Sequence, residues 1–440
     1  SVVAWGGHET NWGQLDVPEG YHYVAIAAGT VHNLALAGEP PAPGPFFYVD
    51  VVNGDDMNNG QTPETAYATI QRGIDSAKDG YTVVVRPGLY LEPESDDSID
   101  FLGKNITLRS ADPTDWDVVD STVIRGGVQF AGTEGPNCTL TGFTIHDRYY
   151  GAIYGNHTRA TISHCVISGN GPCGATVIKE CDGTISNCLI TDNTTFFWCG
   201  IYPVLFGCNG LIKNCTIASN ISGISLGNAT VENCIIYNNS SPQLHIESGG
   251  TLNISYSNVA GGLEGIAGEG QVHWGPGNID TDPCFVRSGY PLEEPLEPFK
   301  GEYHLKSAGW RWNKESKSWT YDYVTSRCVD AGNPGSPLGD ELMSVPRDPD
   351  NEWGVNLRIN MGAYGGTSQA SMPPHGWALL TDLNNDGIVN CADLVEQAMD
   401  WLADATEQPG DLKRDGVVDM KDFSALAGDW LQPAVWLNTE

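Results

Sequence analysis

Two acidic loops near the C-terminal end have the residue types and spacing best suited to binding a metal ion. In the first loop, DLNNDGIVNCAD, oxygen-bearing side chains stand at positions 1, 3, 5, 9 and 12, and position 7 offers a backbone carbonyl. These residues are Asp382, Asn384, Asp386, Ile388, Asn390 and Asp393. Calcium takes about six to eight oxygen ligands from a flexible loop of this kind, with a glycine at position 6 for the turn. The spacing therefore predicts a calcium site in residues 382–393.

The second loop, DLKRDGVVDMKD, begins 29 residues after the first and shares its continuation, so the loop and the helix expected after it form a repeated unit. It retains the matching oxygen positions Asp411, Asp415, Val417, Asp419 and Asp422. Lys413, however, stands at position 3, where an ammonium would repel a cation. Two interpretations remain open for this copy: a second calcium site, or an acidic turn that only caps a helix.

Two polar clusters in the middle of the chain could take part in catalysis. The first contains His146, Asp147 and Arg148, and the second contains Lys179, Glu180 and Asp182. Abstraction of a proton from carbon needs a base beside a cation that neutralises the developing charge, and either cluster offers these types. Polar groups on connecting loops are also commonly just solvated, so the spacing alone assigns no catalytic residue.

Aromatic residues alternate with lysines in RWNKESKSWTYDYV, residues 311–324. Trp312, Trp319 and Tyr321 could stack on sugar rings, or they could belong to a hairpin that packs on its neighbours. Both interpretations fit the sequence.

The elements that must position these residues follow from a repeated phrase. GFTIHD, HCVISGN, NCLITDN, NCTIASN and NCIIYNN recur between about residues 105 and 262, and their cysteines are separated by 23, 27 and 19 residues. Short alternating strands at a period of about 20 to 27 residues predict a solenoid of β coils. We expect an all-β fold, a right-handed parallel β-helix, with a small N-terminal β module and a C-terminal α-helical calcium-binding module.

In such a solenoid, residues at equivalent positions of successive coils lie above one another. The phrases predict an inward ladder of Cys165, Cys188, Cys215 and Cys234, and a ladder of Asn170, Asn193, Asn220 and Asn239 at turns where Asn adopts a left-handed backbone. Disulfides joining Cys173 to Cys181 and Cys199 to Cys208 are open possibilities.

The expected domains follow from composition. A β module at 1–38 is joined by the Pro-rich linker 39–45 to the β-helix at 46–370, and residues 371–378 link the β-helix to the calcium-binding module at 379–440. Residues 62–80 fit an amphipathic capping helix with Ala66, Ile70, Ile74 and Ala77 on one stripe.

The ends of the predicted β-helix resemble those of secreted bacterial proteins of the pectate-lyase-like superfamily. FFYVDVVNGDDMNNG and FLGKNITLRS carry the resemblance at the start, and TSRCVDAGNPGSP and INMGAYGGT carry it at the end. The resemblance implies the fold. Lyases and hydrolases of this group act on polysaccharides with a basic residue or paired carboxylates on one parallel face.

The terminal modules resemble two other families. The two loop-and-helix copies resemble a type I dockerin module over about residues 379–432, which implies calcium binding and a cohesin-like partner. The recognition pair of that family, often Ser-Thr, is Cys391-Ala392 in the first copy and Met420-Lys421 in the second. The first 38 residues resemble one repeat of the regulator of chromosome condensation propeller family, and a single repeat cannot close a ring.

Composition limits the partners. The formal net charge is −33, so the acidic surface makes nucleic acid an unsuitable partner. No apolar run approaches the roughly 18 residues of a membrane span. The chain starts at Ser1 without an apolar leader, as a processed secreted protein would, and calcium loops are filled outside cells, so we expect an extracellular location.

Two functions fit these features. The first is a secreted, non-catalytic structural or adhesive protein that assembles through its terminal modules, with other copies of itself or a surface protein, into a fibre, surface layer or matrix. The second is a lyase on acidic polysaccharide, anchored by the dockerin-like module. We expect the first, because a negative surface repels polyuronates.

Overall fold

The computed structural model describes residues 22–28, 33–38, 45–91, 98–146, 151–171, 176–194, 202–240, 242–289, 301–342, 354–402 and 407–438. The chain divides into two compact units, Ser1–Phe46 and Phe47–Glu440. In the first unit, β1 (His22–Ala28) pairs with β2 (Asn33–Gly38) as an antiparallel hairpin. The rest of the predicted propeller-type repeat lies outside the described residues.

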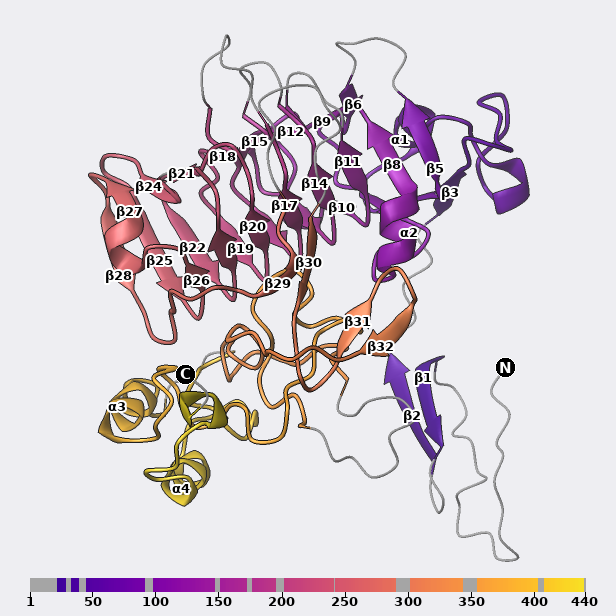
Figure 1. Cartoon of the computed structure of the whole chain (residues 1–440). Helices are drawn as coiled ribbons and strands as arrows, with labels where there is room; N and C mark the ends of the chain where they lie inside the picture. The colour runs from indigo at the N-terminus through magenta and orange to yellow at the C-terminus, as the bar shows by residue number, and fades with distance from the viewer. Residues whose placement is uncertain are drawn as a thin grey trace, which may run out of the picture. The chain divides into compact units, whose positions relative to one another are not determined.

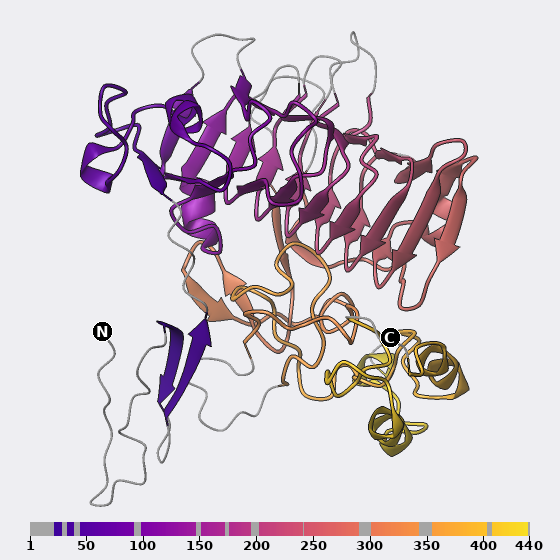
Figure 2. The same cartoon turned by 180° about the vertical axis from the view of Figure 1, so that it is seen from behind.

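The second unit is built on a solenoid in which each coil adds one strand to each of three sheets (Figures 1 and 2). Sheet I contains β3 (Phe46–Val49), β4 (Thr82–Val85), β7 (Thr107–Ser110), β10 (Thr139–Thr141), β13 (Thr161–Ser163), β16 (Thr184–Ser186), β19 (Leu211–Lys213), β22 (Ala229–Glu232), β25 (Thr251–Ser255) and β28 (Gln271–Trp274). Sheet II contains β5 (Gly88–Leu91), β8 (Thr122–Arg125), β11 (Thr144–His146), β14 (Val166–Ser168), β17 (Leu189–Thr191), β20 (Thr216–Ala218), β23 (Ile235–Tyr237) and β26 (Asn258–Val259). Sheet III contains β6 (Ser98–Asp100), β9 (Gly127–Gln129), β12 (Ile153–Thr158), β15 (Ile178–Cys181), β18 (Leu205–Phe206), β21 (Ile224–Leu226), β24 (Leu244–Ile246) and β27 (Ile266–Gly268). Within these three sheets the paired strands from β4 to β28 run parallel, so the predicted parallel β-helix is confirmed.

The phrase TISHCVISGN shows why one coil turns where it does. Ile162 and Ile167 point inward from β13 and β14 and are fully buried. Between them, His164 has a φ of 50°, so the chain turns a corner in the left-handed region before Cys165 returns inward. Stacking of this phrase on its copies builds one continuous apolar core inside the three sheets.

Both predicted ladders are confirmed, with one correction to the turn geometry. The four ladder thiols are buried, and each donates to the carbonyl two residues before it. The ladder asparagines bond to one another from coil to coil. The left-handed residue, however, is the one before each asparagine: Gly169, Asp192, Ser219 and Asn238. The asparagine side chain needs a position that turns it inward, so its predecessor makes the turn.

Cys181 and Cys208 are free, buried thiols inside the solenoid, so the disulfides considered for them do not form. Each follows a residue with a left-handed backbone, Glu180 or Gly207, and this turn returns the thiol to the core. Cys173 and Cys199 lie outside the described residues.

The N-terminal cap is shorter than the predicted helix 62–80. Helix α1 spans only Ile70–Ser76, and the 3-10 helix η1 (Pro63–Thr65) precedes it. Thr62 caps η1 and Thr69 caps α1, which splits the segment into two short helices. The four residues of the predicted apolar stripe are nevertheless all buried.

After the last coil, a tail of about residues 279–372 folds back along sheet II and covers its outer face (Figure 1). The tail contains the antiparallel pair β29 (Phe285–Arg287) and β30 (Glu302–Leu305). Outward residues of sheet II, such as Val166 and Leu189, join Tyr303 and Tyr364 of the tail in a second apolar core. The Tyr303 hydroxyl donates to Asp192 at 2.7 Å. The tail therefore buries the outer face of β14, β17, β20 and β23 in sheet II.

The C-terminal module consists of α3 (Cys391–Met399), α4 (Met420–Gly428) and the 3-10 helix η4 (Val435–Asn438). Both α-helices begin with a capping box, Asn390 with Asp393 and Asp419 with Asp422. Among the helices that the structure describes, none is long and apolar enough to cross a membrane.

Candidate functional site

Outward side chains of sheet III form a continuous row along the solenoid. The parallel register aligns Asp100, Gln129, Tyr154, Lys179, Phe206, Ser225, His245 and Ala267 on successive strands. Tyr154 and Phe206 are 43% and 36% exposed, and Lys179 stands between them. Strands lie about 4.8 Å apart, so the row offers an aromatic, a cationic and an aromatic group at regular short intervals. Aromatic faces beside a cation suit an anionic sugar chain.

Two contacts orient Lys179 on this surface. Its Nζ atom lies 3.3 Å from Glu180 Oε1 and 5.1 Å from the centroid of the Tyr154 ring. The Lys179 side chain is 38% exposed, so the ion pair with Glu180 is accessible to solvent. Exposed ion pairs of this kind contribute about 1 kcal/mol or less, and a ligand carboxylate could exchange with Glu180.

A bulge in β12 lies beside the row. Tyr154 pairs with Lys179 and Thr158 pairs with Cys181, so three residues of β12 stand opposite one residue of β15. Two of the three, Asn156 and His157, have φ angles of 51° and 69°. Left-handed residues also make coil turns elsewhere in this chain, as at His164, so the bulge itself is the distinguishing feature. Bulges are common where a functional side chain is re-aimed.

The bulge brings His157 to Asp182. His157 Nδ1 lies 3.0 Å from Asp182 Oδ2, while Asp182 Oδ1 accepts bonds from the Asn209 backbone N–H and side-chain amide, both at 3.1 Å. The carboxylate is thereby fixed, and the imidazole side chain remains 61% exposed. A carboxylate at Nδ1 favours the tautomer in which Nε2 can accept a proton. The pair has the arrangement of an oriented general base.

The structure places in full only one of the two clusters considered for catalysis. Lys179, Glu180 and Asp182 do lie together on sheet III, where His157 joins them. His146 ends β11 in sheet II and aligns with Ser168 of the next coil. Asp147 and Arg148 lie outside the described residues, so the structure does not place that cluster.

The aromatic segment at 311–324 forms the hairpin β31 (Arg311–Asn313) and β32 (Ser318–Thr320). The Trp312 and Trp319 rings pack edge to face, with centroids 5.9 Å apart. Lys317 and Lys314 pair with Asp117 and Asp120 of helix α2 (Trp116–Ser121). Tyr321 remains 57% exposed. The rings face one another rather than forming one flat strip, so this hairpin is a poorer sugar platform than sheet III.

In the first acidic loop, the carboxylates organise the backbone. Asp382 accepts bonds from the backbone N–H groups of Asp386 and Gly387, and Asp393 accepts bonds from Leu383 and Asn390. Burial raises the pKa of Asp382 to about 6, and the nearby carboxylates of Asp393 and Asp386 add to this against the opposing charge of Arg358. A divalent cation would offset that mutual repulsion, so these residues fit calcium. Asn384 and Asn390, with the Ile388 carbonyl, would supply the neutral ligands.

The second loop differs because a lysine lies against its acids. Lys421 Nζ is 2.7 Å from Asp415 Oδ2 and 3.7 Å from Asp419 Oδ2. The hydrogen bond from Lys421 lowers the pKa of Asp415. The ammonium would compete with a metal ion for Asp415 and Asp419, whereas Asp411 and Asp422 accept backbone N–H groups as their equivalents in the first loop do. Throughout the described part of the chain, no three His, Cys, Asp or Glu side chains form a metal site by themselves.

Comparison with known proteins identifies the solenoid. Residues 126–273 match the family model described as a right-handed β-helix region. The solenoid is a right-handed β-helix. Similar solved structures include a rhamnogalacturonan lyase, 15% identical with a TM-score of 0.27 over 49% of this chain and 68% of that one. Another is a pectate lyase, 14% identical with a TM-score of 0.24 over 72% of this chain and 95% of that one. A search of curated proteins finds no match.

Sequence reasoning missed His157 and Asn209. His157 stands 25 residues before Asp182, and Asn209 stands 27 residues after it. Asp182 and Asn209 each stand six residues before a ladder cysteine, so they occupy equivalent places on successive coils, and alignment of the coils on their cysteines could have paired them. His157 stands eight residues before Cys165 and lies in the bulge of β12, so the same alignment would have missed it.

Proposed function

We propose that this β-helix protein binds an acidic polysaccharide along the outer face of sheet III and cleaves it as a lyase. The observation that carries the proposal is the His157–Asp182 pair, held by a bulge on the coil next to Lys179. Bulges commonly re-aim a functional side chain.

The row on sheet III would hold the substrate. Tyr154 and Phe206 offer partly exposed aromatic rings, and Lys179 offers a positive charge between them. The chain as a whole carries a formal net charge of −33, so a polyanion needs such a local cation to approach.

The chemistry assigned to the pair is β-elimination. His157 Nε2 takes the proton from the carbon next to the uronate carboxylate, while Lys179 stabilises the negative charge that develops on that carboxylate. The electron pair forms a carbon–carbon double bond as the glycosidic C–O bond breaks, and the leaving oxygen takes up a proton. The products are an unsaturated uronide and a new chain end, and no water is consumed.

The test is to incubate the full chain with uronate-containing polysaccharides and follow the absorbance of the unsaturated product. Replacing His157 by Ala should lower the rate by about 10²- to 10⁴-fold, the usual contribution of a general base. His273→Ala, which alters an exposed histidine on sheet I, is the matched control and should leave the rate unchanged.

Phe206→Ala should mainly raise KM, whereas Lys179→Ala should also lower kcat, because Lys179 stabilises charge that develops in the transition state. Binding without product would reduce the proposal to carbohydrate recognition. Neither binding nor product on any uronate polymer would refute it.

We also propose that the first loop binds calcium and that the second does not. The difference rests on Lys421, whose ammonium lies among the acids of the second loop. Calorimetric titration should therefore find one calcium ion per chain. The double variant Lys413→Asn, Lys421→Met should add a second ion, and two ions in the unaltered protein would contradict the assignment.

A second candidate function is docking of the C-terminal module to a cohesin-like or other surface protein, or to another copy of the chain, as an adhesive or structural protein requires. The observation that favours it is an apolar stripe on α3 and just after it: Val395, Met399 and Leu402 are 53%, 74% and 68% exposed. Exposed stripes of this kind mark interaction sites. Electron microscopy of the full chain with calcium should show polymers if copies dock to one another, and monomers alone would count against self-assembly.

Extracellular location belongs to both proposals, because calcium and plant-type or microbial polysaccharides are abundant outside cells. Secretion can be tested by fractionating the cells that make the protein.

A further inference from the structure

The two acidic loops contact the tail through equivalent residues. Asn385 and Arg414 each occupy the fourth position of their loop, with φ angles of 59° and 54°. The Asn385 side-chain amide donates to the carbonyls of Gly277 and Ala331, both at 2.8 Å. Arg414 donates to the carbonyls of Pro334 and Leu357, at 3.1 and 2.7 Å. The repeat therefore places two pairs of donors on one face of the module, and that face lies on the end of the β-helix and its tail.

Arg358 makes the opposite contact, from the tail to the first loop. Its guanidinium is 1% exposed and donates to the Gly332 carbonyl at 2.7 Å and to the Asp382 carbonyl at 2.7 Å. An arginine buried this deeply is stable only while its hydrogen bonds are made. Its partners include the first residue of the acidic loop, so the tail depends on the position of that residue.

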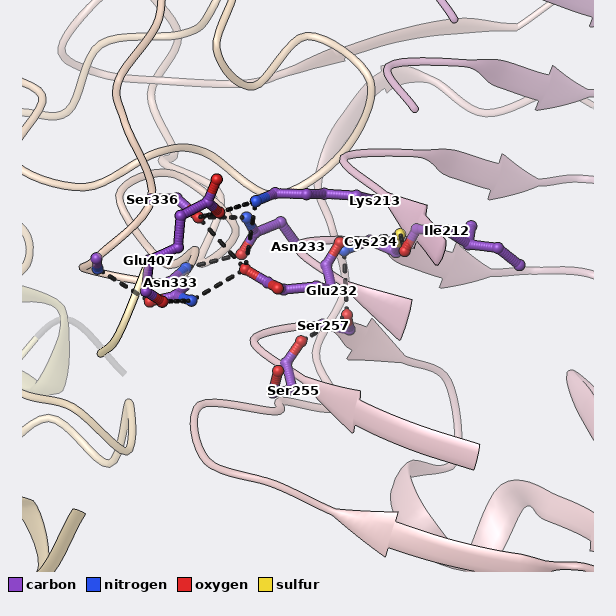
Figure 3. Close-up of polar contacts among 11 residues, drawn as sticks. Ile212, Lys213, Glu232, Asn233, Cys234, Ser255, Ser257, Asn333, Ser336 and Glu407 are labelled. Atoms are coloured by element: carbon purple, nitrogen blue, oxygen red, sulfur yellow. Dashed lines mark hydrogen bonds and ion pairs between the residues drawn. The ribbon is translucent and has the colours of Figure 1, made fainter. Parts of the chain in front are cut away.

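A third contact joins the segment between the two repeats to the coils (Figure 3). Glu407 pairs with Lys213 of β19 and accepts a bond from Ser336 at 3.0 Å. Asn333 donates to Glu232 of β22 at 3.0 Å and to the Glu407 carbonyl at 2.9 Å. Coil, tail and module thus meet in one hydrogen-bonded cluster.

Asp382 links these contacts to the ion. Its carboxylate bonds the Asp386 and Gly387 N–H groups that shape the loop, while its own carbonyl receives Arg358. A cation bound to the carboxylate would fix the same residue whose carbonyl anchors the tail. Asn385, three residues further on, is set by the same turn.

We propose that the acidic repeat is a cation-controlled clamp on its own β-helix: calcium in the first loop fixes Asp382 and Asn385 against the tail, and loss of calcium loosens the module. In the tail, the two acidic loops contact residues 331–334 and 357–358 of the same chain. This inference rests on the proposed calcium binding of the first loop and is independent of lyase activity.

Hydrogen exchange of the full chain, with calcium and with a chelator, tests the clamp. The informative amides lie in the tail, where Gly332 bonds Ile359 and Met361 bonds Cys328. Calcium removal should speed their exchange by about tenfold or more, because hydrogen bonds to a buried charged group are lost. In calcium, Asn385→Ala and Arg414→Gln should have the same effect, while Lys413→Gln, one residue away and with an exposed side chain, should not.

The outcomes separate the two proposals. If the chelator changes neither the loop nor the tail, the loop does not bind calcium and control by the ion is overturned. If the chelator speeds exchange in residues 382–393 but leaves the tail unchanged, calcium binds and the clamp is overturned. Faster exchange in both segments, reproduced by Asn385→Ala and Arg414→Gln, supports it.

Discussion

Asn220→Ala should destabilise the β-helix strongly, because this side chain lies in the middle of the asparagine ladder. Its amide donates to the Ile190 carbonyl at 2.9 Å and to Asn239 Oδ1 at 2.8 Å. Its carbonyl oxygen accepts the backbone N–H and the side-chain amide of Asn193, at 3.1 and 2.9 Å. The residue is fully buried, so water cannot replace these bonds.

The magnitude follows from the groups left behind. Asn239 Oδ1 still accepts the Asn220 N–H, and the Asn193 amide still donates to Ile167. The Ile190 carbonyl and the Asn193 N–H lose the bonds that Asn220 makes, and each buried unsatisfied group costs about 1–3 kcal/mol. With the small cavity added, we expect a loss of about 4 kcal/mol, a large part of the roughly 5–15 kcal/mol of a typical domain.

Urea unfolding followed by circular dichroism measures this loss as a lower midpoint with an unchanged slope. Asn228→Ala is the matched control: its side chain is exposed and accepts one bond, from the Thr251 N–H at 3.1 Å. It should cost about 1 kcal/mol or less. A loss below about 1 kcal/mol for Asn220→Ala would show that the ladder does not stabilise the coils and would refute the reasoning.

Three further predictions concern the core and the tail. Cys188→Ser should lower the free energy of unfolding by about 1 kcal/mol or less in the same assay. A serine hydroxyl can take over the bond of the thiol, because Ser257, which follows Cys234 in the cysteine ladder, donates to the carbonyl two residues before it just as Cys188 does. Gly183→Ala should cost about 3 kcal/mol or more, since its Cβ would lie 2.0 Å from the Ala160 oxygen; a soluble, equally stable variant would show that the coil can shift. Burial raises the pKa of Asp330 from 3.8 to about 7, so its folded form holds a proton that the unfolded form loses. The contribution of Asp330 to stability should be fullest below about pH 4 and fall by up to about 4 kcal/mol towards pH 7, and Asp330→Asn should remove that part of the pH profile.

The coils could be predicted because their information is local and repeated. A phrase such as TISHCVISGN places Ile162, Cys165 and Ile167 inward by the alternation of a strand, and the next copy repeats the pattern. The left-handed turn was assigned one residue too late, since the repeat shows only that Asn170 recurs and not which backbone position makes the turn.

The candidate site was only partly predictable. Lys179 and Asp182 stood out as a local cluster, but His157 reaches them only because β12 bulges and one coil returns the chain to the same place. The tail is a harder case: Arg358 and Asn385 contact carbonyl groups of distant segments, and any residue type can supply a carbonyl. Such contacts leave no pattern in the sequence.

The sequence by itself determined the β-helix, its thiol and asparagine ladders, and the acidic loops, because each depends on residue type at a short, repeated spacing. Only the tertiary structure decided that the tail covers sheet II, that sheet III is left with an exposed row, and that the module rests on its own chain. These arrangements depend on which surfaces meet after the coils have formed. They are stabilised by contacts between residues far apart in the sequence, such as Lys213 and Glu407, which are 194 positions apart.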